Sequence, residues 1–245
     1  MMQGLNLDDF DAVTFDVYGT LIDWEPSIIA FLNAWADRHG IAVEGHALLM
    51  AFDRARAAIQ KERPAHLYPD VLRRCFDQIC AEYGVEPDAQ TREAFAESPK
   101  TWPAYQDSHE GLIALQARAK VGALSNIDEA SLRASSAKIG FTFDIVVTAE
   151  RVGAYKPDWL HFHTAIDELA ALGIAKERIL HVGQSLRADV VPANKLGLTS
   201  AWVHRPGREL GLSGDGVEAA KPDLTVTSLA ELVAALSGTN PRSAA

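Results

Sequence analysis

The alternation of short apolar runs with helical patterns after Pro103 is the strongest constraint on the fold. Each run is short and mostly apolar, which is typical of a buried strand. Segments with helical periodicity separate the runs, and Gly140, Gly173 and Gly197 end three of these helices. Strands that alternate with helices form parallel βαβ units, so we predict an α/β protein with a doubly wound parallel sheet. The predicted strands are 121–124, 145–148, 179–182, 200–203 and 224–226, and the predicted helices are 108–119, 128–139, 158–172, 187–196 and one from Ser228.

One further strand precedes these elements, and a long helical segment separates it from them. Residues 12–21 read AVTFDVYGTL, an apolar run that brings Asp16 to the end of a strand and into a Gly-Thr turn. Residues 26–98 show helical periodicity throughout, and Gly40 and Gly84 are among the residues that divide them into four helices. We therefore predict an α/β core of residues 1–22 and 103–236, an inserted helical domain at 23–102, and a disordered tail at 237–245.

The composition supports a full hydrophobic core and argues against several kinds of partner. The chain is 48% hydrophobic with a net charge of −10, and it has no basic run, so we expect neither nucleic-acid nor membrane binding. It has no stretch of 18 apolar residues and no signal-peptide pattern. Cys75 and Cys80 point in different directions on a predicted helix, which disfavours a disulfide or a metal site. We expect a soluble cytoplasmic protein that binds a small molecule.

Polar side chains follow four of the predicted strands at the point where each strand ends. Because the carboxyl ends of parallel strands meet at one edge of a sheet, we expect these groups to converge on one crevice. Asp16 is the candidate nucleophile, since a carboxylate is ionised at neutral pH without help from a base. Taken alone, Asp16 could equally be a solvated residue or a helix cap, and Asp189 could also be a cap. The converging residues are Asp16, Tyr18 and Thr20, then Ser125 and Asn126, then Lys156, and finally Gln184, Ser185 and Asp189.

This arrangement resembles the haloacid dehalogenase superfamily over nearly the whole chain. The first motif of that family is an apolar strand ending in Asp-x-x-Gly-Thr, which is Asp16 to Thr20 here. Its second motif is matched by Ser125, its third by Lys156-Pro157, and its fourth by the acidic loop 183–189. The resemblance implies that Asp16 is a covalent nucleophile and that the helical insertion is a mobile cap that closes over it.

Two positions separate this chain from the magnesium-dependent phosphatases of that superfamily. Those enzymes use a second Asp, two residues after the nucleophile, as a general acid, and Tyr18 stands there instead. A phenol with an ordinary pKa near 10 is poorly matched to proton transfer at neutral pH. The phosphatase motif also offers the metal an Asp at the position of Gln184, whereas magnesium prefers anionic oxygen ligands. We therefore disfavour a phosphatase and expect no metal and no cofactor.

The same residues resemble the L-2-haloacid dehalogenases, a branch that needs no metal. The resemblance implies that Asp16 displaces halide from a small (S)-2-haloacid and that water then cleaves the resulting ester at the carboxyl carbon of Asp16, which yields a 2-hydroxy acid. Halide leaves without a proton, so the lack of an acid at position 18 is no handicap. In the implied roles Lys156 orients Asp16, while Thr20 and Ser125 donate hydrogen bonds to the carboxylates. The amides of Val17 and Tyr18 bind the substrate carboxylate, and Asp189 positions Lys156 or activates water. Asn126 helps to hold the halide, Arg54 or the next arginine, Arg56, draws it off, and Trp24 lines the pocket with Tyr68 and Trp102.

The fourth motif departs from that of the studied dehalogenases, which commonly read Ser-Ser-Asn-x-x-Asp. Gln184 stands in place of the first Ser of that motif, and Leu186 stands in place of its Asn. The catalytic loop, which includes Gln184, must therefore hold the hydrolytic water in a different way. The alternatives are a hydrolase that uses the same Asp16 ester on another small organic acid, a magnesium-dependent phosphatase, and a catalytically silent binding protein. An apolar stripe that includes Trp35 on the first inserted helix would suit a homodimer.

Overall fold

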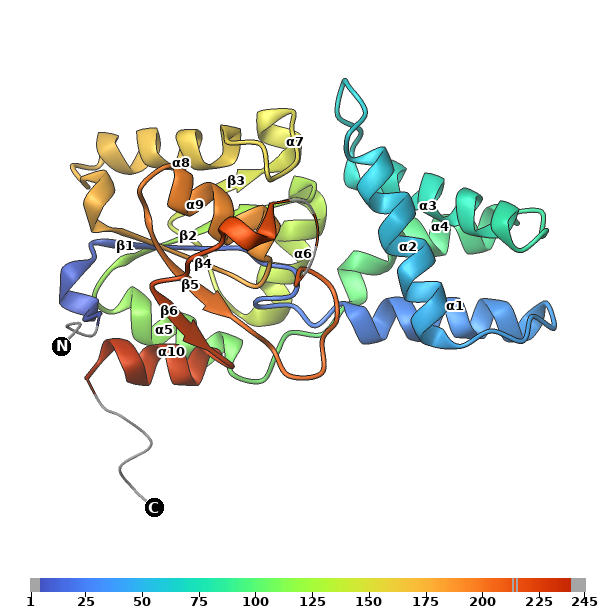
Figure 1. The fold of residues 1–245 in the computed structure, drawn as a ribbon, viewed down its shortest axis with the longest axis horizontal. Helices are drawn as coiled ribbons and strands as arrows, with labels where there is room; N and C mark the ends of the chain where they lie inside the picture. The colour runs from blue at the N-terminus through green and yellow to red at the C-terminus, as the bar shows by residue number, and fades with distance from the viewer. Residues whose placement is uncertain (1–4, 213, 215, 239–245) are drawn as a thin grey trace, which may run out of the picture.

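The computed structural model describes residues 5–212, 214 and 216–238, and these form a six-stranded parallel sheet with helices around it (Figure 1). The strand order is β3-β2-β1-β4-β5-β6, so the chain starts in the middle of the sheet and winds outward in both directions. The prediction of a doubly wound α/β fold is confirmed. The strands are β1 Ala12–Phe15, β2 Lys120–Ser125, β3 Ile145–Thr148, β4 Ile179–Gly183, β5 Thr199–Val203 and β6 Leu224–Val226.

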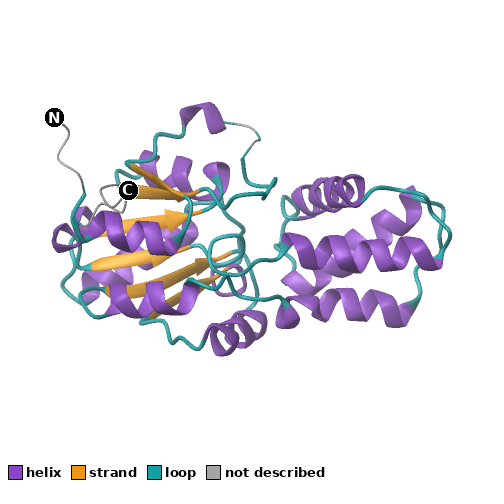
Figure 2. Ribbon diagram, turned by 90° about the horizontal axis from the view of Figure 1, so that it is seen from below, coloured by secondary structure: helices purple, strands orange, loops and turns teal. Residues whose placement is uncertain are grey.

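Helices cover both faces of this sheet (Figure 2). Helices α8 (Leu160–Ala171) and α9 (Val191–Lys195) contribute to a hydrophobic cluster on one face. Helices α5 (Ser108–Gln116), α6 and α10 contribute to a second and larger cluster. Every residue of β1 and β4 is buried, which explains why these strands read as continuous apolar runs. The remaining helices of this part are α6 Glu129–Ile139, α7 Ala149–Val152 and α10 Leu229–Leu236, with short 3₁₀ helices at Leu7–Asp9, Lys176–Arg178 and Val217–Ala219.

Four further helices lie beside the sheet and together form the insertion between β1 and β2 (Figure 1). They are α1 (Glu25–Arg38), α2 (Gly45–Ile59), α3 (Tyr68–Glu82) and α4 (Ala89–Glu97), followed by a short 3₁₀ helix at Ser98–Thr101. Helix α2 packs against both α1 and α3, and α3 packs against α4. We call residues 23–102 the insertion.

The two chain segments that connect the insertion to the sheet run side by side. Ile22 and Ala104 form an antiparallel bridge. The amide of Asp23 donates to the carbonyl of Pro103 at 2.8 Å, and the amide of Tyr105 donates to the carbonyl of Leu21 at 3.0 Å. The insertion therefore leaves and rejoins the α/β part at a single junction.

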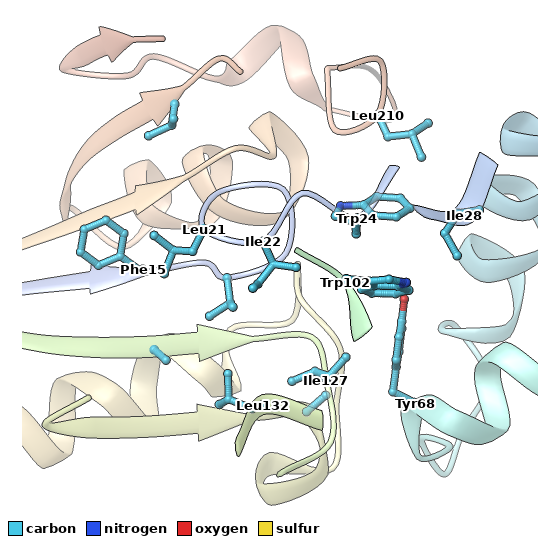
Figure 3. Packing of buried hydrophobic residues seen from close by; sticks show 14 of the residues in the cluster. Phe15, Leu21, Ile22, Trp24, Ile28, Tyr68, Trp102, Ile127, Leu132 and Leu210 are labelled. Atoms are coloured by element: carbon cyan, nitrogen blue, oxygen red, sulfur yellow. The ribbon is translucent and has the colours of Figure 1, made fainter. Parts of the chain in front are cut away.

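Aromatic side chains fill the space where the insertion meets the sheet. Figure 3 shows Trp24 and Trp102 between the strand ends and the inserted helices. Their ring centroids lie 6.1 Å apart, and Trp24 also lies 5.9 Å from the ring of Phe52 on α2. Both tryptophans belong to the large hydrophobic cluster that also contains the β1 residue Val13. The core is therefore continuous from the sheet into the insertion.

Several smaller expectations can be compared with the structure. Cys75 and Cys80 are buried free thiols, as expected. Within the part of the chain that the structure describes, no helix has the length and apolar character needed to cross a membrane. The segment expected as one helix at 187–196 is instead a π-helix, Leu186–Val190, followed by α9. Residues 239–245 of the expected disordered tail lie outside the described residues.

Candidate active site

The register of the sheet places the groups that follow β1, β2 and β4 at one edge. Phe15, the last residue of β1, is paired with Ala123 and with Val182. The next residue, Asp16, therefore lies level with the ends of both neighbouring strands, and its amide donates to the carbonyl of Val182 at 2.9 Å. This is the edge at which open α/β sheets bind their ligands.

A buried lysine lies between two carboxylates at this edge. Nζ of Lys156 lies 3.0 Å from Oδ1 of Asp16 and 2.7 Å from Oδ1 of Asp189, and it donates to the carbonyl of Leu124 at 2.7 Å. The side chains of Lys156 and Asp189 are each 1% exposed and that of Asp16 is 11% exposed. An ammonium group has three N–H donors, so all three are used. Lys156 is therefore fixed, and it fixes Asp16.

The backbone around Asp189 is shaped to bring its carboxylate close to the sheet. A Cβ atom at Gly183 would lie 2.5 Å from Cβ of Asp189, so only glycine fits at the end of β4. The amide of Ser185 donates to Oδ2 of Asp189 at 3.1 Å, and Nε2 of His181 lies 3.5 Å from Oδ1. Both oxygens of Asp189 therefore have partners from the protein.

Thr20 connects the turn after β1 to the loop after β4. Its hydroxyl donates to Oδ2 of Asp16 at 2.8 Å and accepts a hydrogen bond from the amide of Gln184 at 2.9 Å. Because that amide can only donate, the proton of Thr20 is directed to Asp16. The tight turn between them passes through Gly19, whose φ of 101° is in the region that favours glycine.

Burial and charge set opposite protonation tendencies on the two carboxylates. Burial raises the pKa of Asp16 to about 6 against the opposing effect of Lys156, and the negative charge of Asp189 adds to the rise. Burial acts in the same direction on Asp189, but Lys156 and the hydrogen bond with His181 outweigh it and hold that pKa at about 2. Burial lowers the pKa of His181, so its ring is neutral at pH 7. At neutral pH the site therefore holds two carboxylates and one ammonium group.

Ser125, the last residue of β2, and Asn126, which follows it, have different surroundings. Asn126 holds the loop that carries Lys156, because its Nδ2 donates to the Lys156 carbonyl at 3.0 Å and its Oδ1 accepts from the Lys156 amide at 2.7 Å. The hydroxyl of Ser125 is buried and has no hydrogen-bond partner within the described residues. A buried hydroxyl without a partner is uncommon in folded proteins. Ser125 does not line the cavity, so this hydroxyl is an unpaired donor buried behind the cavity wall.

Tyr18 faces the site with its ring while its hydroxyl group is engaged elsewhere. The hydroxyl lies 2.7 Å from Oγ of Ser135 on α6, and the ring packs edge-on against Trp102 at 5.5 Å. Burial raises the pKa of the Tyr18 phenol above its ordinary value. Tyr18 is therefore a poor proton donor at neutral pH.

A cavity of about 520 Å³ opens between this edge of the sheet and the insertion. On the α2 side its wall is formed by residues 53, 56, 57 and 60, which share one face of a helix at spacings of three and four. Arg56 belongs to this face, forms an ion pair with Asp53, and lies 5.4 Å above the ring of Trp24. The lining residues include Asp16, Tyr18, Asn126, Lys156, Gln184 and Asp189 from the α/β part, and Trp24, Asp53, Arg56, Gln60 and Tyr68 from the insertion.

A family model for haloacid dehalogenase-like hydrolases matches residues 10–197. The chain belongs to this family. The haloacid dehalogenase-like hydrolase domain-containing protein 3 of Bos taurus is 28% identical over 209 residues, which cover 79% of this chain and 82% of that protein. An (S)-2-haloacid dehalogenase of Burkholderia cepacia is 26% identical over 208 residues, covering 82% of this chain and 86% of that protein.

Other similar proteins include a phosphatase and a dehalogenase of known structure. The 5-amino-6-(5-phospho-D-ribitylamino)uracil phosphatase of Escherichia coli (strain K12) is 26% identical over 240 residues, which cover 92% of this chain and 96% of that protein. The L-2-haloacid dehalogenase from Xanthobacter autotrophicus, solved with chloropropionic acid covalently bound, gives a TM-score of 0.77 at 22% identity and covers 94% of this chain and 100% of that chain. The structural match shows a shared fold.

The donor set of this haloacid dehalogenase-like hydrolase does not fit a magnesium ion. Gln184 contributes a neutral amide, which donates to the carbonyl of Leu210 and lies so close to Gly211 that a Cβ there would be 2.6 Å from Oε1. Both oxygens of Asp189 already have protein partners. Among the described residues, no three His, Cys, Asp or Glu side chains are grouped so that they could hold a metal ion. Both oxygens of Asp16 are likewise paired, with Lys156 and Thr20, so neither carboxylate at this edge is free for magnesium, which is usually bound by one or two carboxylates.

The structure brings most of the predicted site residues of this hydrolase together, but Arg54, Val17, Thr20 and Ser125 do not line the cavity. Arg54 does not line the cavity: its side chain is 63% exposed and pairs with Glu82 on α3 at 3.0 Å. Arg56, the other candidate, does line it. The expectation for Arg54 is therefore corrected to Arg56, because the two side chains lie on different faces of α2. Val17 is fully buried and its side chain does not line the cavity, so only its backbone faces the turn after β1.

Sequence reasoning missed two parts of the cavity wall. Gln60 could have been found, because residues 53, 56, 57 and 60 repeat at helical spacing beside the apolar stripe of α2. The loop after β5 carried no such signal, although Leu210 and Gly211 line the cavity. This loop is held by the buried carboxylate of Glu25, which accepts from the amides of Glu209 at 3.0 Å and Leu210 at 3.1 Å.

Proposed function

We propose that this hydrolase is a metal-independent dehalogenase that converts small (S)-2-haloacids into 2-hydroxy acids through an ester on Asp16. The observation that carries the proposal is the lack of an acid beside the nucleophile. Tyr18 occupies that position, its hydroxyl is paired with Ser135, and burial raises its pKa. An alkoxide leaving group needs a proton, whereas halide leaves as a stable anion. The site therefore favours substitution at a carbon that bears a halogen.

In the first step of this proposal, a carboxylate oxygen of Asp16 attacks C2 of the substrate. The new C–O bond forms as the carbon–halogen bond breaks and the electron pair leaves with the halide. Lys156 and Thr20 hold the two oxygens of Asp16 from opposite sides and so restrict the angle of attack. Backbone amides of Val17 and Tyr18 are the proposed donors to the substrate carboxylate.

Cations and donors around the cavity would receive the departing halide. Arg56 supplies a guanidinium group from the insertion, and Asn126 lies at the cavity from the opposite side. The hydroxyl of Ser125 has no partner within the described residues, but Ser125 does not line the cavity, so we assign it no contact with the substrate. The Arg56 side chain is 25% exposed, and such a partly buried cation stabilises a halide more strongly than a fully exposed one does, because the local dielectric constant is lower.

In the second step, water adds to the carboxyl carbon of Asp16, and the C–O bond of the ester breaks to give the 2-hydroxy acid. We assign Asp189 a positioning role here. Its side chain is 1% exposed, both of its oxygens have partners, and its pKa of about 2 makes it a weak base. It keeps Lys156 charged and in place throughout the cycle, after Asp16 has lost its own charge in the ester.

The proposal is tested by measuring halide release from L-2-chloropropionate with and without EDTA. We expect release in both conditions, and a loss of more than about 10³-fold in Asp16→Asn. Asp167→Asn, a change at an exposed residue of α8, is the matched control and should retain activity. Failure to release halide from any short 2-haloacid would contradict the proposal, as would activity that persists in Asp16→Asn.

The route of the oxygen atom gives a second and independent test. In a single turnover in ¹⁸O-labelled water with enzyme in excess, the product should contain no label and the peptide that carries Asp16 should gain it. Label in the first-turnover product would indicate direct attack by water on the substrate.

Because one relative is a phosphatase, phosphate release from p-nitrophenyl phosphate should also be measured with added magnesium. Magnesium-dependent turnover of this phosphate ester would favour a phosphatase activity over the proposed dehalogenase activity.

A further inference from the structure

The wall that α2 contributes to the cavity carries hydrogen-bond donors without acceptors. Gln60, at the end of α2, lines the cavity, and its Nε2 is buried with no partner within the described residues. One helical turn earlier, Nε of Arg56 is buried and unpaired as well. A buried donor without an acceptor is unfavourable, and most such groups in folded proteins have a partner. Because Gln60 lines the cavity, a rotation about its Cγ–Cδ bond brings the Nε2 donor to a molecule bound there, which can supply the missing acceptor.

The charges around the cavity show what kind of acceptor is suited to this wall. Each aspartate that lines the cavity has a cationic partner that also lines it. Lys156 pairs with Asp16 and Asp189, Arg56 pairs with Asp53, and Arg63 lies 3.9 Å from Asp158. Two lining cations are left over. The side chains of Lys61 and Arg187 have no hydrogen-bond or ion-pair partner within the described part of the chain.

We propose that the preferred substrate is a 2-haloacid that carries a second carboxylate, and that Gln60 is the residue that selects for it. This inference rests on the proposed function, because it takes the reaction at Asp16 as given. The reacting end of the acid lies at Asp16, and the second carboxylate accepts from Gln60 in the field of Lys61 and Arg187. An alkyl group in the same place would leave the Gln60 amide unpaired.

The dimensions of the wall suit a four-carbon dicarboxylic acid. Arg56 and Gln60 are four residues apart, which is about 6 Å along a helix axis. That spacing lets the halogen on C2 face Arg56 while a carboxylate carried by C3 faces Gln60, as in a four-carbon dicarboxylic acid. A monocarboxylic 2-haloacid with three carbons leaves much of the cavity of about 520 Å³ unfilled, since cavities of 300–1,000 Å³ suit larger ligands.

The test compares two substrates of equal chain length, (S)-2-chlorosuccinate and (S)-2-chlorobutyrate, by the kcat/KM for halide release. We expect the ratio of the two values to exceed about ten in the wild type and to fall at least about fivefold in Gln60→Leu. Gln60→Glu, which keeps the shape and adds a negative charge, should lower the ratio further. Gln90→Leu at an exposed position of α4 is the matched control and should leave the ratio unchanged.

A purely structural role for Gln60 would reduce both kcat/KM values alike and leave their ratio intact, and that result would overturn the proposal. A wild-type preference for chlorobutyrate would also overturn it. Raised ionic strength should reduce the ratio, because Lys61 is exposed and its attraction is screened.

Binding of unreactive acids separates this proposal from the proposed function. Succinate and butyrate are titrated against the wild type and Gln60→Leu by calorimetry, with no reaction involved. If neither chloroacid is hydrolysed but succinate binds more tightly than butyrate in a Gln60-dependent way, the dehalogenase function fails and the carboxylate subsite stands. If halide is released but the two acids bind alike in both proteins, the subsite fails and the dehalogenase function stands.

Discussion

Replacing Lys156 by Met removes the only cation that contacts both carboxylates at the site within the described residues. Nζ of Lys156 lies 3.0 Å from Asp16 and 2.7 Å from Asp189, and its side chain is 1% exposed. Met fills a similar volume, so the change removes charge and hydrogen bonds rather than packing. Breaking a buried ion pair by removing one partner costs about 3–5 kcal/mol. We expect the free energy of unfolding of Lys156→Met to be lower than that of the wild type by this amount at pH 8.

The pH dependence identifies the cause of the loss. Burial raises the pKa of Asp16 to about 6 in the wild type, above its ordinary value near 4. The unfolded chain therefore loses this proton first, and the contribution of Asp16 to the free energy of unfolding falls as the pH rises from 4 to 6. Above pH 6 that contribution no longer changes. Without Lys156 the folded-state pKa of Asp16 moves higher still. The variant should therefore continue to lose about 1.4 kcal/mol per pH unit above pH 6 for each carboxylate whose pKa has moved into that range.

Urea unfolding followed by circular dichroism from pH 5 to pH 8.5 measures this difference. The control is Lys120→Met, which breaks the ion pair of Lys120 with Asp144, in which the lysine is 52% exposed, and should cost less than about 1 kcal/mol at every pH. A deficit in Lys156→Met that does not change between pH 6 and pH 8.5 would refute the electrostatic argument. It would assign the loss to packing instead.

Three further predictions concern activity. The kcat/KM for halide release should rise with pH to a plateau with an apparent pKa near 6, because Asp16 must be ionised to attack, and a profile that is flat from pH 5 to pH 8 would count against this. Arg56→Ala should lower kcat/KM by about 10²-fold in steady-state assays, whereas Arg54→Ala, at an exposed position away from the cavity, should leave it within about twofold. Gly183→Ala should lower the free energy of unfolding in urea by about 1–3 kcal/mol and should lower kcat, because the added Cβ would lie 2.5 Å from Asp189 and displace it. An unchanged kcat would contradict the role given to the position of Asp189.

The parts of the site that follow strand ends could be predicted from the sequence because the topology of a parallel sheet decides their location. Asp16 comes directly after Phe15, which is level with Val182 in the sheet, so the loop after β4 had to lie beside it. Lys156 follows the same logic from the loop after β3. These positions depend on which strands are neighbours and on where each strand ends, and the pattern of apolar runs in the sequence already indicates where the strands end.

The insertion was harder to predict in detail, although its four helices were expected. A helix pattern shows which face is apolar, but it does not show which polar side chains face a neighbouring domain. Arg54 and Arg56 are both polar residues of α2, and only the packing of α2 against the sheet edge turns Arg56 toward the cavity. The loop that carries Leu210 is held by Glu25, a contact between residues far apart in sequence that no local pattern encodes.

The junction between the insertion and the sheet has a consequence for how such a protein can be rebuilt. Ile22 and Ala104 form an isolated antiparallel bridge, and the amide of Asp23 donates to the carbonyl of Pro103 just beyond them. A two-residue hairpin turn is the usual way to join strands at such a point. The helical unit can thus be exchanged for another without changing the strand order, provided that the replacement covers the apolar surface against which Trp24 and Trp102 pack. That modularity separates the evolution of substrate choice, which the insertion governs in our proposal, from that of the nucleophile.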